Sequence, residues 1–316
     1  MSASTPVPIA IVGLGKIARD QHLPAIAADG RFRLAAIVSG SGQTVDGLPT
    51  FPTLEALFAG APEVAAVSLC TPPTGRFSYV ETALRAGRHV MLEKPTAASL
   101  GEAEAIAELG RGSDRTLFAT WHSRANPAVA EAARLLRGKA LLRLAIDWRE
   151  DVRRWHPGQA WIWQPGGFGV FDPGINALSI ATAIAPSPLF VTAARLETAE
   201  NHQTPIGATL RFATPGMAPG ADLAAVFDWR KEGEQSWTIE VEAQGGPSLR
   251  LTEGGGRLAL DGREVSLPPP AEYPALYDRF ATLIAGQASD VDLRPLTLVA
   301  DAFTLGERIA VPRFEG

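Results

Sequence analysis

The stretch VFDPGINAL, residues 170–178, carries two side chains that could do chemistry. Asp172 directly precedes Pro173, and Asn176 follows four residues after the acid. A carboxylate can accept a proton, whereas an amide can only orient a partner through hydrogen bonds. The same pattern is typical of a helix start, where Asp172 accepts a backbone N–H and Pro173 fills a position that needs no donor. Taken alone, the stretch leaves both interpretations open.

A glycine-rich stretch near the N-terminus, GLGKIA, directly follows the apolar run IAIV. Gly13, Gly15 and Ala18 occupy the three positions of the dinucleotide-binding fingerprint. Glycine there permits a tight turn and a close approach of the backbone to a pyrophosphate, which lies at a helix N-terminus. We therefore predict that this loop binds NAD or NADP. The alternative is a packing turn in a similar domain that binds no cofactor.

The second strand of such a domain normally ends in a residue that selects the cofactor. Here AAIVSGSGQ offers Ser39 and Gly40 where an acidic residue would bond the ribose of NAD. No arginine follows directly to hold the 2′-phosphate of NADP. We therefore expect the protein to use both NAD+ and NADP+.

The elements that must position these residues alternate between short apolar runs and helical segments. This alternation predicts a parallel, doubly wound sheet with helices between the strands. We therefore predict an α/β fold whose Rossmann domain, residues 1–122, binds the dinucleotide. The predicted strands are 9–12, 34–38, 64–69, 89–92 and 116–119, and the predicted helices are 17–28, 54–59, 77–86 and 100–109.

The pattern changes after residue 122, where one helical segment, 129–136, is followed by longer alternating runs. Such alternation predicts strands of a largely antiparallel sheet. We predict a second α+β domain over residues 123–316 for substrate binding and oligomerisation. An amphipathic helix predicted over 296–309 could pack back on the first domain. The runs read as strands are LLRLAIDWRED, LFVTAARLETAE, IGATLRFAT, ADLAAVFDWRKE and SWTIEVEAQG.

The composition of the 316 residues argues against several classes of protein. The formal charge is −5 with no block of lysine or arginine, which argues against a nucleic-acid or membrane surface. Cys70 is the only cysteine, so no internal disulfide can form. With no basic leader segment and no apolar run of ~20 residues, we expect a cytoplasmic protein. The five histidines are scattered, and we expect no metal site.

Several motifs resemble one family of dehydrogenases. HVMLEKPTAASL at 89–100, joined to GLGKIA and SLCTPP, resembles the glucose–fructose oxidoreductase/inositol dehydrogenase/MocA family. The tripeptide Glu-Lys-Pro at the end of a Rossmann strand is the most specific mark of that family. The stretches ARDQHLPAI, TWHSR, EDVRRWHPGQ and GGFGVFDPGINALSI are similar to its branch of bacterial D-galactose and L-arabinose 1-dehydrogenases. The resemblance spans almost the whole chain.

The resemblance implies three catalytic residues. Lys94 and Asp172 match the lysine and the acid of the family, and Asn176 stands where most members carry a histidine. Because an amide cannot take a proton at neutral pH, proton abstraction falls to Lys94 and Asp172. Asn176 would orient the hydroxyl. The implied cofactor contacts are Gly13, Gly15, Lys16, Ile17, Ser39, Thr71, Pro72, Glu93 and Lys94.

Further side chains are candidates for contact with the substrate beside Lys94, Asp172 and Asn176. His122 follows the last predicted Rossmann strand, at the carboxyl edge where ligands of such folds lie. Trp155 lies in the stretch RRWHPGQAWIWQPGG, and its ring could cover the C–H face of a sugar. Structural roles remain open for both, as for the other tryptophans of that stretch, Trp161 and Trp163. Glu150, Asp151 and Arg153 are predicted to form structural ion pairs, although one could reach the sugar.

The activity implied by the resemblance is NAD(P)-dependent oxidation of C1 of D-galactose or L-arabinose to the lactone. One alternative is another dehydrogenase of the family, acting on a cyclitol, an amino sugar or a dihydrodiol. A second is a regulator that binds NAD(P) without catalysis, although such a relative would be expected to lack the lysine or the acid. We also expect a homodimer or larger homo-oligomer, because the run 222–229 is largely apolar on both faces.

Overall fold

The computed structural model describes residues 5–315, which divide into two compact units. The first unit contains the chain up to His122 together with Ala271–Leu293. The second contains Ser123–Pro270 and the residues from Arg294 onward. The division near residue 122 lies where the sequence pattern changes. The return of 271–293 to the first unit differs from the continuous second domain predicted from the sequence.

The first unit is built on a six-stranded parallel sheet in the order β3-β2-β1-β4-β5-β6. This is the order of a dinucleotide-binding Rossmann domain, whose ligands bind beyond the carboxyl ends of the strands where the order reverses. That reversal falls between β1 and β4. The elements are β1 (Val7–Val12), α1 (Leu23–Ala28), β2 (Phe32–Val38), β3 (Thr50–Phe51), α2 (Leu54–Gly60), β4 (Ala66–Leu69), α3 (Arg76–Arg85), β5 (His89–Leu92), α4 (Leu100–Arg111), β6 (Leu117–Ala119) and α8 (Glu272–Ala285).

Local sequence explains most of these elements. The last four residues of β1 and all of β4 are buried, as expected for central strands covered on both faces. The side chains of Thr53 and Ser99 cap α2 and α4 by accepting backbone N–H groups at 3.2 Å. Buried parallel strands and these two side-chain caps therefore account for much of the α/β unit, while α1 and α3 begin without a side-chain cap.

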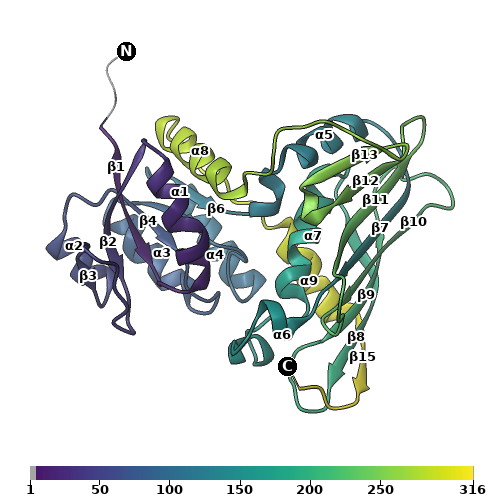
Figure 1. Ribbon diagram of the computed structural model, residues 1–316, viewed down its shortest axis with the longest axis horizontal. Helices are drawn as coiled ribbons and strands as arrows, with labels where there is room; N and C mark the ends of the chain where they lie inside the picture. The colour runs from purple at the N-terminus through teal and green to yellow at the C-terminus, as the bar shows by residue number, and fades with distance from the viewer. Residues whose placement is uncertain (1–4, 316) are drawn as a thin grey trace. The chain divides into compact units, whose positions relative to one another are not determined.

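Helix α8 explains why a late segment of the chain belongs to the first unit. Its buried stripe includes Tyr273, Tyr277 and Phe280. The Phe280 ring stacks on Phe32 of β2 with 5.7 Å between ring centroids, and α8 lies beside α1 (Figure 1). Local periodicity predicts such an amphipathic helix but does not indicate which core its apolar stripe will join.

The second unit contains a nine-stranded mixed sheet in the order β14-β13-β12-β11-β7-β10-β9-β8-β15. Most neighbours are antiparallel, while β7–β10 and β8–β15 are parallel. The elements are α5 (Pro127–Leu136), β7 (Leu141–Arg149), α6 (Val152–Trp155), α7 (Phe171–Ile184), β8 (Phe190–Ala199), β9 (Gly207–Ala213), β10 (Asp222–Asp228), β11 (Ser236–Ala243), β12 (Leu249–Thr252), β13 (Arg257–Leu260), β14 (Arg263–Glu264), α9 (Arg294–Leu305) and β15 (Gly306–Val311).

Helix α7 is the central helix of this unit and carries the stretch VFDPGINAL. It packs against α5, α9 and the strands β7 and β11, on one side of the sheet (Figure 1). All its residues are buried except Asn176 and Ala183, which are half-buried. A Cβ on Gly174 would lie 2.9 Å from the ring of Phe227 on β10, so glycine permits the close contact of helix and sheet.

The C-terminal helix is shorter than the sequence predicts. The segment 296–309 is not one helix: α9 ends at Leu305 and the strand β15 follows, paired in parallel with β8. The strand satisfies backbone groups at the otherwise open edge of β8, which the helical pattern did not reveal. Helix α9 contacts α7 and β8, so it belongs to the second unit and not to the first. No helix within residues 5–315 has the length and apolar character needed to cross a bilayer.

Candidate functional site

The glycine-rich loop follows β1 and touches the end of β4. Gly13 has a φ of +88°, in the left-handed region that favours glycine. A Cβ on Gly13 would lie 3.0 Å from the Thr71 side chain and 3.1 Å from its backbone nitrogen. Glycine is therefore required there by both the backbone conformation and the contact.

The same loop leaves room for a phosphate. A Cβ on Gly15 would meet no atom within 4 Å, so the backbone there faces open space. Lys16 and Ile17, the next residues, are exposed, and the Lys16 ammonium pairs with Asp20. The Thr71 hydroxyl oxygen is buried and has no hydrogen-bond partner within residues 5–315. An open glycine and an unpaired polar atom beside a helix start fit the pyrophosphate of a dinucleotide.

The end of β2 is neutral but lies within reach of a cation. The buried Ser39 hydroxyl accepts the backbone N–H of Gln43 at 3.0 Å and lies 3.2 Å from the Ser41 hydroxyl. Arg19, from the helical turn after the glycine loop, donates to the Gln43 side chain at 3.3 Å. The sequence did not single out Arg19, because it precedes β2, whereas a residue that holds the 2′-phosphate is expected after Ser39.

One buried arginine holds two predicted cofactor loops together. Arg76 of α3 is 2% exposed although its guanidinium is charged. The loops after β4 and β5 are far apart in sequence, and this side chain fixes them to each other. Its acceptors are the backbone carbonyl oxygens of Thr71, Pro72, Glu93 and Pro95. Nothing in the sequence pattern singled out Arg76.

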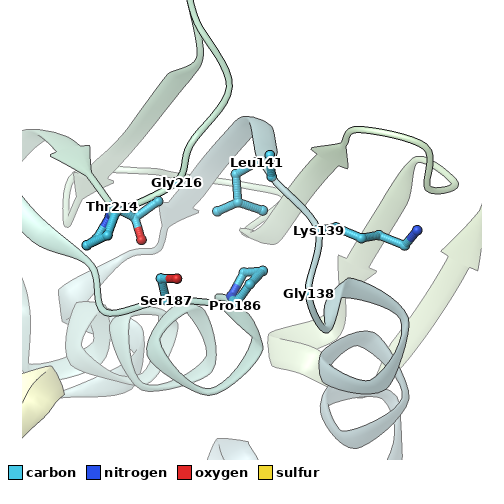
Figure 2. A pocket seen from close by; sticks show the side chains of 9 residues that line it. Gly138, Lys139, Leu141, Pro186, Ser187, Thr214 and Gly216 are labelled. Carbon is cyan, nitrogen blue, oxygen red and sulfur yellow. The ribbon is translucent and has the colours of Figure 1, made fainter.

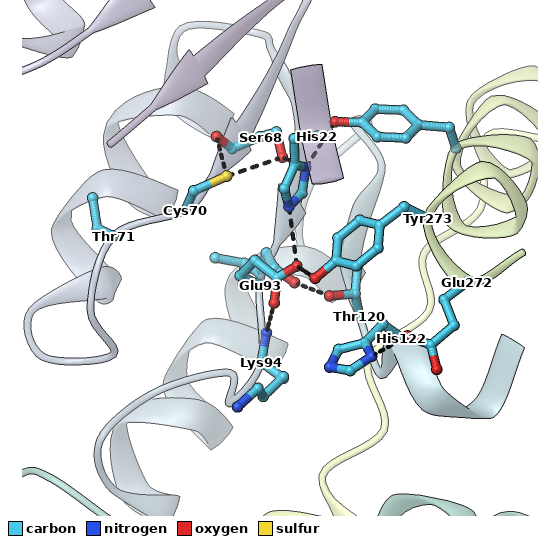
Figure 3. Close-up of polar contacts among 12 residues, drawn as sticks. His22, Ser68, Cys70, Thr71, Glu93, Lys94, Thr120, His122, Glu272 and Tyr273 are labelled. Carbon is cyan, nitrogen blue, oxygen red and sulfur yellow. Dashed lines mark hydrogen bonds and ion pairs between the residues drawn. The ribbon is translucent and has the colours of Figure 1, made fainter. Parts of the chain in front are cut away.

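Glu93 is buried directly before Lys94 and lies at the centre of a polar network (Figure 3). One carboxylate oxygen lies 3.0 Å from Nε2 of His22 and accepts the Tyr273 hydroxyl at 2.8 Å. The other oxygen accepts the backbone N–H of Lys94 at 2.9 Å. The Lys94–Pro95 peptide bond is cis. The backbone that carries Lys94 is thus anchored by a buried acid.

His22 connects this acid to further buried groups. Its Nδ1 lies 2.8 Å from the Tyr277 hydroxyl and 3.2 Å from the Ser68 hydroxyl. Cys70, which is half-buried, has its Sγ 3.8 Å from the same serine oxygen. The network joins the helical turn after the glycine loop, β4, β5 and α8.

The network shifts the pKa values of its members. Burial by itself raises the pKa of Glu93, but the hydrogen bond and charge of His22, with Tyr273 and His122, lower it to about 2. Burial by itself lowers the pKa of His22, but its interactions with Cys70, Tyr277 and Glu93 raise the pKa well above 6.5. Burial and the nearby Glu93 charge raise the pKa of Tyr273. Glu93 is therefore ionised beside a protonated His22 at neutral pH.

His122 lies beside the same network, after β6. Its Nδ1 is 2.7 Å from a carboxylate oxygen of Glu272, and its ring stacks on Tyr273 at 5.7 Å (Figure 3). The Glu272 contact orients the imidazole, which leaves Nε2 as the other polar edge of the ring.

The second unit contains the remaining predicted residues. Val170 takes the N-cap position of α7 and makes no side-chain cap bond. Asp172 is the second residue of the helix and is 6% exposed. The interpretation of Asp172 as the helix cap was therefore wrong, because the cap position lies two residues earlier, at Val170. Asn176 follows one turn later on the same face. Its Oδ1 is buried and has no hydrogen-bond partner within the described chain, as expected of a polar atom whose partner is a bound ligand.

Asp172 lies close to a histidine that was not singled out from the sequence. Nδ1 of His156 is 3.6 Å from Oδ2 of Asp172, and its Nε2 is 3.6 Å from Oε1 of Glu150. Glu150, predicted to form an ion pair, faces His156, and its carboxylate also accepts indole N–H groups from Trp229 and Trp237. The motif EDVRRWHPGQ contained both residues but did not show that they meet.

The tryptophans differ in exposure. Trp155 is 38% exposed, with its ring edge-on to Trp237 at 5.4 Å and the Arg154 guanidinium 4.8 Å from its centroid. Trp161 is half-buried. Trp163 is buried and stacks on His202 at 4.0 Å. Trp163 is therefore a core residue, while Trp155 is partly exposed to solvent.

One open pocket in the second unit contains none of these residues (Figure 2). It lies between the turn before β7 and the loops after α7 and β9, where Lys139, Ser187 and Thr214 contribute the polar side chains. The Lys139 ammonium donates to the Gly245 carbonyl at 2.8 Å.

The predicted site residues therefore fall into two groups. The cofactor residues, Lys94 and His122 belong to the first unit, and Asp172, Asn176 and Trp155 to the second. Within the first unit the structure brings the glycine loop, Thr71 and the loop of Lys94 together at the carboxyl ends of the strands. Such a site defines the class of oxidoreductases that bind a nicotinamide dinucleotide on a Rossmann fold.

Comparison with known proteins supports this class. Residues 7–120 match the family described as "Oxidoreductase family, NAD-binding Rossmann fold" (GFO_IDH_MocA). Galactose 1-dehydrogenase from Pseudomonas fluorescens is 43% identical over 98% of this chain and 99% of its own. The chain belongs to this GFO_IDH_MocA oxidoreductase family.

Solved structures agree with this assignment. D-galactose-1-dehydrogenase from Rhizobium etli matches with a TM-score of 0.93 and 48% identity over the whole of both chains. The 3-ketoreductase KijD10 from Actinomadura kijaniata, solved with NADP and TDP-benzene, matches with a TM-score of 0.81. At 20% identity over 97% of this chain and all of its own, KijD10 shows the shared fold alone.

Proposed function

We propose that the protein is an NAD(P)-dependent aldose 1-dehydrogenase that oxidises C1 of D-galactose, and also of L-arabinose, to the lactone. The observation that carries the proposal is the likeness, over full length, to two galactose 1-dehydrogenases at 43% and 48% identity. The residues expected to do the chemistry, Lys94, Asp172 and Asn176, are all present in this chain.

The cofactor residues fit a nicotinamide dinucleotide. Gly13 and Gly15 would hold the pyrophosphate, Ser39 would face the ribose, and Thr71, Pro72 and Glu93 would border the nicotinamide half. The bound nicotinamide supplies the hydride acceptor. The neutral surroundings of Ser39, with Arg19 nearby, suit a ribose with or without a 2′-phosphate, so we propose that both NAD+ and NADP+ are used.

The remaining residues would hold the sugar and manage the proton of its C1 hydroxyl. We propose that Lys94 bonds the C1 oxygen and that Asp172 accepts the proton, directly or through the lysine. The unpaired Oδ1 of Asn176 would accept a hydrogen bond from a sugar hydroxyl. His122 and the partly exposed Trp155 are proposed as further sugar contacts.

Selectivity between sugars follows from their configuration. D-galactose and L-arabinose share the ring configuration at C2, C3 and C4 and differ only at the substituent on C5. D-glucose inverts C4, which would turn one hydroxyl away from its partner and leave a buried polar group unpaired. That mismatch costs roughly 1–3 kcal/mol, or about 10- to 100-fold in kcat/KM.

The test is to incubate the protein with NAD+ or NADP+ and a panel of aldoses, cyclitols, amino sugars and dihydrodiols, and to follow the absorbance of the reduced nicotinamide. We expect turnover with galactose and arabinose. Turnover confined to cyclitols, amino sugars or dihydrodiols would point to another dehydrogenase of the family. Dinucleotide binding with no turnover on any compound would point to a regulator.

We also propose that the protein is a homodimer or larger. On β10 the side chains of Leu223, Ala225 and Phe227 are buried, while Ala224 and Val226 on the other face are half-exposed. This second face is less apolar than the sequence suggested, because ion pairs such as Arg143–Glu240 border it. Light scattering at micromolar concentration should show a dimer or a larger species, and a monomer would contradict the proposal.

A further inference from the structure

An imidazole lies between two buried carboxylates in the second unit. His156 presents Nδ1 to Asp172 and Nε2 to Glu150, each nitrogen 3.6 Å from the facing oxygen. The side chains of Asp172 and Glu150 are 8% and 7% exposed, and that of His156 is 16% exposed. These separations slightly exceed a hydrogen bond, and a small movement would close either contact.

Glu150 is held in place by neutral groups. Trp237 donates its indole N–H to one carboxylate oxygen at 2.9 Å, and Trp229 donates to the other at 3.3 Å. Neutral donors solvate a buried carboxylate without cancelling its charge, so that charge remains to act on the facing His156. The His156 ring also lies 5.2 Å from the Trp229 ring, which fixes its position.

We propose that His156 receives the proton that Asp172 takes from the substrate hydroxyl, and that Glu150 stabilises the imidazolium that forms. This proposal rests on the proposed function, since it needs a hydroxyl to be oxidised beside Asp172. An imidazolium between two carboxylates is favoured by both charges. Passing the proton on returns Asp172 to its carboxylate form for the next turnover.

The O–H bond of the hydroxyl breaks and its proton goes to Asp172, while the C1–H bond breaks and its electron pair leaves with the hydrogen to the oxidised nicotinamide. The carbon–oxygen double bond forms at C1. The proton then moves from Asp172 to Nδ1 of a His156 ring that carries its own proton on Nε2, facing Glu150, and the imidazolium releases one N–H proton to solvent before the next turnover. Nδ1 can accept the proton only in this tautomer.

The other polar groups near His156 are either neutral or engaged with other side chains. Gln159 Oε1 is 3.5 Å from Nδ1 and is neutral. On α6 itself, Arg153 is paired with two acids, and Arg154 lies over an indole ring. Asp172 from α7 and Glu150 from the end of β7 are therefore the charges that face the imidazole.

The first test needs no activity. The chain has five histidines, so imidazole resonances can be followed by NMR against pH and the His156 signal assigned by its loss in His156→Asn. In Glu150→Gln and in Asp172→Asn the titration midpoint of this signal should fall, because each variant removes a facing charge. Asp151→Asn is the matched control, since Asp151 bonds Arg153, and it should leave the midpoint in place. A midpoint unmoved in both test variants would overturn the proposal.

The second test is kinetic. His156→Asn should lower kcat about 10²-fold while the KM values for sugar and dinucleotide stay within about threefold, and added imidazole should restore part of kcat. His202→Asn, which removes a ring stacked on Trp163, is the matched control and should keep kcat. His156→Gln replaces the first variant if that variant fails to fold. A raised sugar KM with unchanged kcat would overturn the proton transfer. Absence of any sugar oxidation by the wild type would instead defeat the proposed function, while the NMR result would still decide the arrangement of charges.

Discussion

Replacing His22 with leucine should destabilise the first unit strongly, because it leaves the buried Glu93 carboxylate without its facing imidazole. The fall of the Glu93 pKa from 4.5 to about 2 corresponds to roughly 3 kcal/mol of stability at neutral pH. Breaking one partner of a buried pair typically costs 3–5 kcal/mol, which agrees with that figure. We therefore expect His22→Leu to lower the free energy of unfolding by about 3–5 kcal/mol.

The pH dependence of this loss follows from the two shifts. The Glu93 contribution is present above about 4.5, its unfolded pKa, and is lost as the pH falls towards about 2. The His22 contribution is present below 6.5 and is lost as the pH rises through its raised folded pKa. The stability difference between wild type and His22→Leu should therefore be largest between about pH 4.5 and 6.5.

Urea unfolding followed by far-UV circular dichroism measures the difference, and hydrogen–deuterium exchange of a peptide spanning 89–94 locates it. The control is the double variant His22→Leu/Glu93→Gln, which removes the charge along with its partner and should recover more than half of the loss. A loss of unfolding free energy below about 1 kcal/mol in His22→Leu would refute the reasoning. A loss in the double variant equal to the sum of the losses in His22→Leu and Glu93→Gln would refute it as well.

Three further predictions concern catalysis and the cofactor. Lys94→Ala and Asp172→Asn should each lower kcat by ~10²–10⁴ while the circular dichroism stays unchanged and dinucleotide binding is retained, and an active folded Asp172→Asn would show that the acid is structural. Gly13→Ala should lower the melting temperature because the loop has no room for a Cβ, whereas Gly15→Ala should keep it and lower dinucleotide affinity, measured by calorimetry. Ser39→Asp should raise the ratio of kcat/KM for NAD+ to kcat/KM for NADP+, because the new carboxylate repels a 2′-phosphate. An unchanged ratio would mean that another residue contacts the ribose and sets the cofactor preference.

Much of the Rossmann unit could be predicted because its signals are local. Strands such as β1, β2 and β5 are apolar runs bounded by glycines and charged residues, and the glycine loop follows the first of them directly. The short strands β12, β13 and β14 lacked a run long enough to stand out from the turns between them. Neither α8 nor β15 could be placed, because their partners lie far away in the sequence.

The candidate site also contains some residues that local sequence could identify and others that it could not. Lys94, Asp172 and Asn176 carry motif signals, so the sequence alone could nominate them. Arg76 could not be found, because its acceptors are backbone carbonyls, which leave no trace in residue types. The approach of His156 to Asp172 depends on how the segment between β7 and α7 folds over the sheet, and spacing in the chain does not reveal that distance.

The measurement that tests the central proposal most directly is kcat/KM for D-galactose and for D-glucose, with the oxidised product identified by NMR. We expect galactose to yield the 1,5- or 1,4-lactone, and glucose to be oxidised with a kcat/KM about 10- to 100-fold lower. Equal values for the two sugars, or a product oxidised at a carbon other than C1, would contradict the assignment of an aldose 1-dehydrogenase selective for galactose.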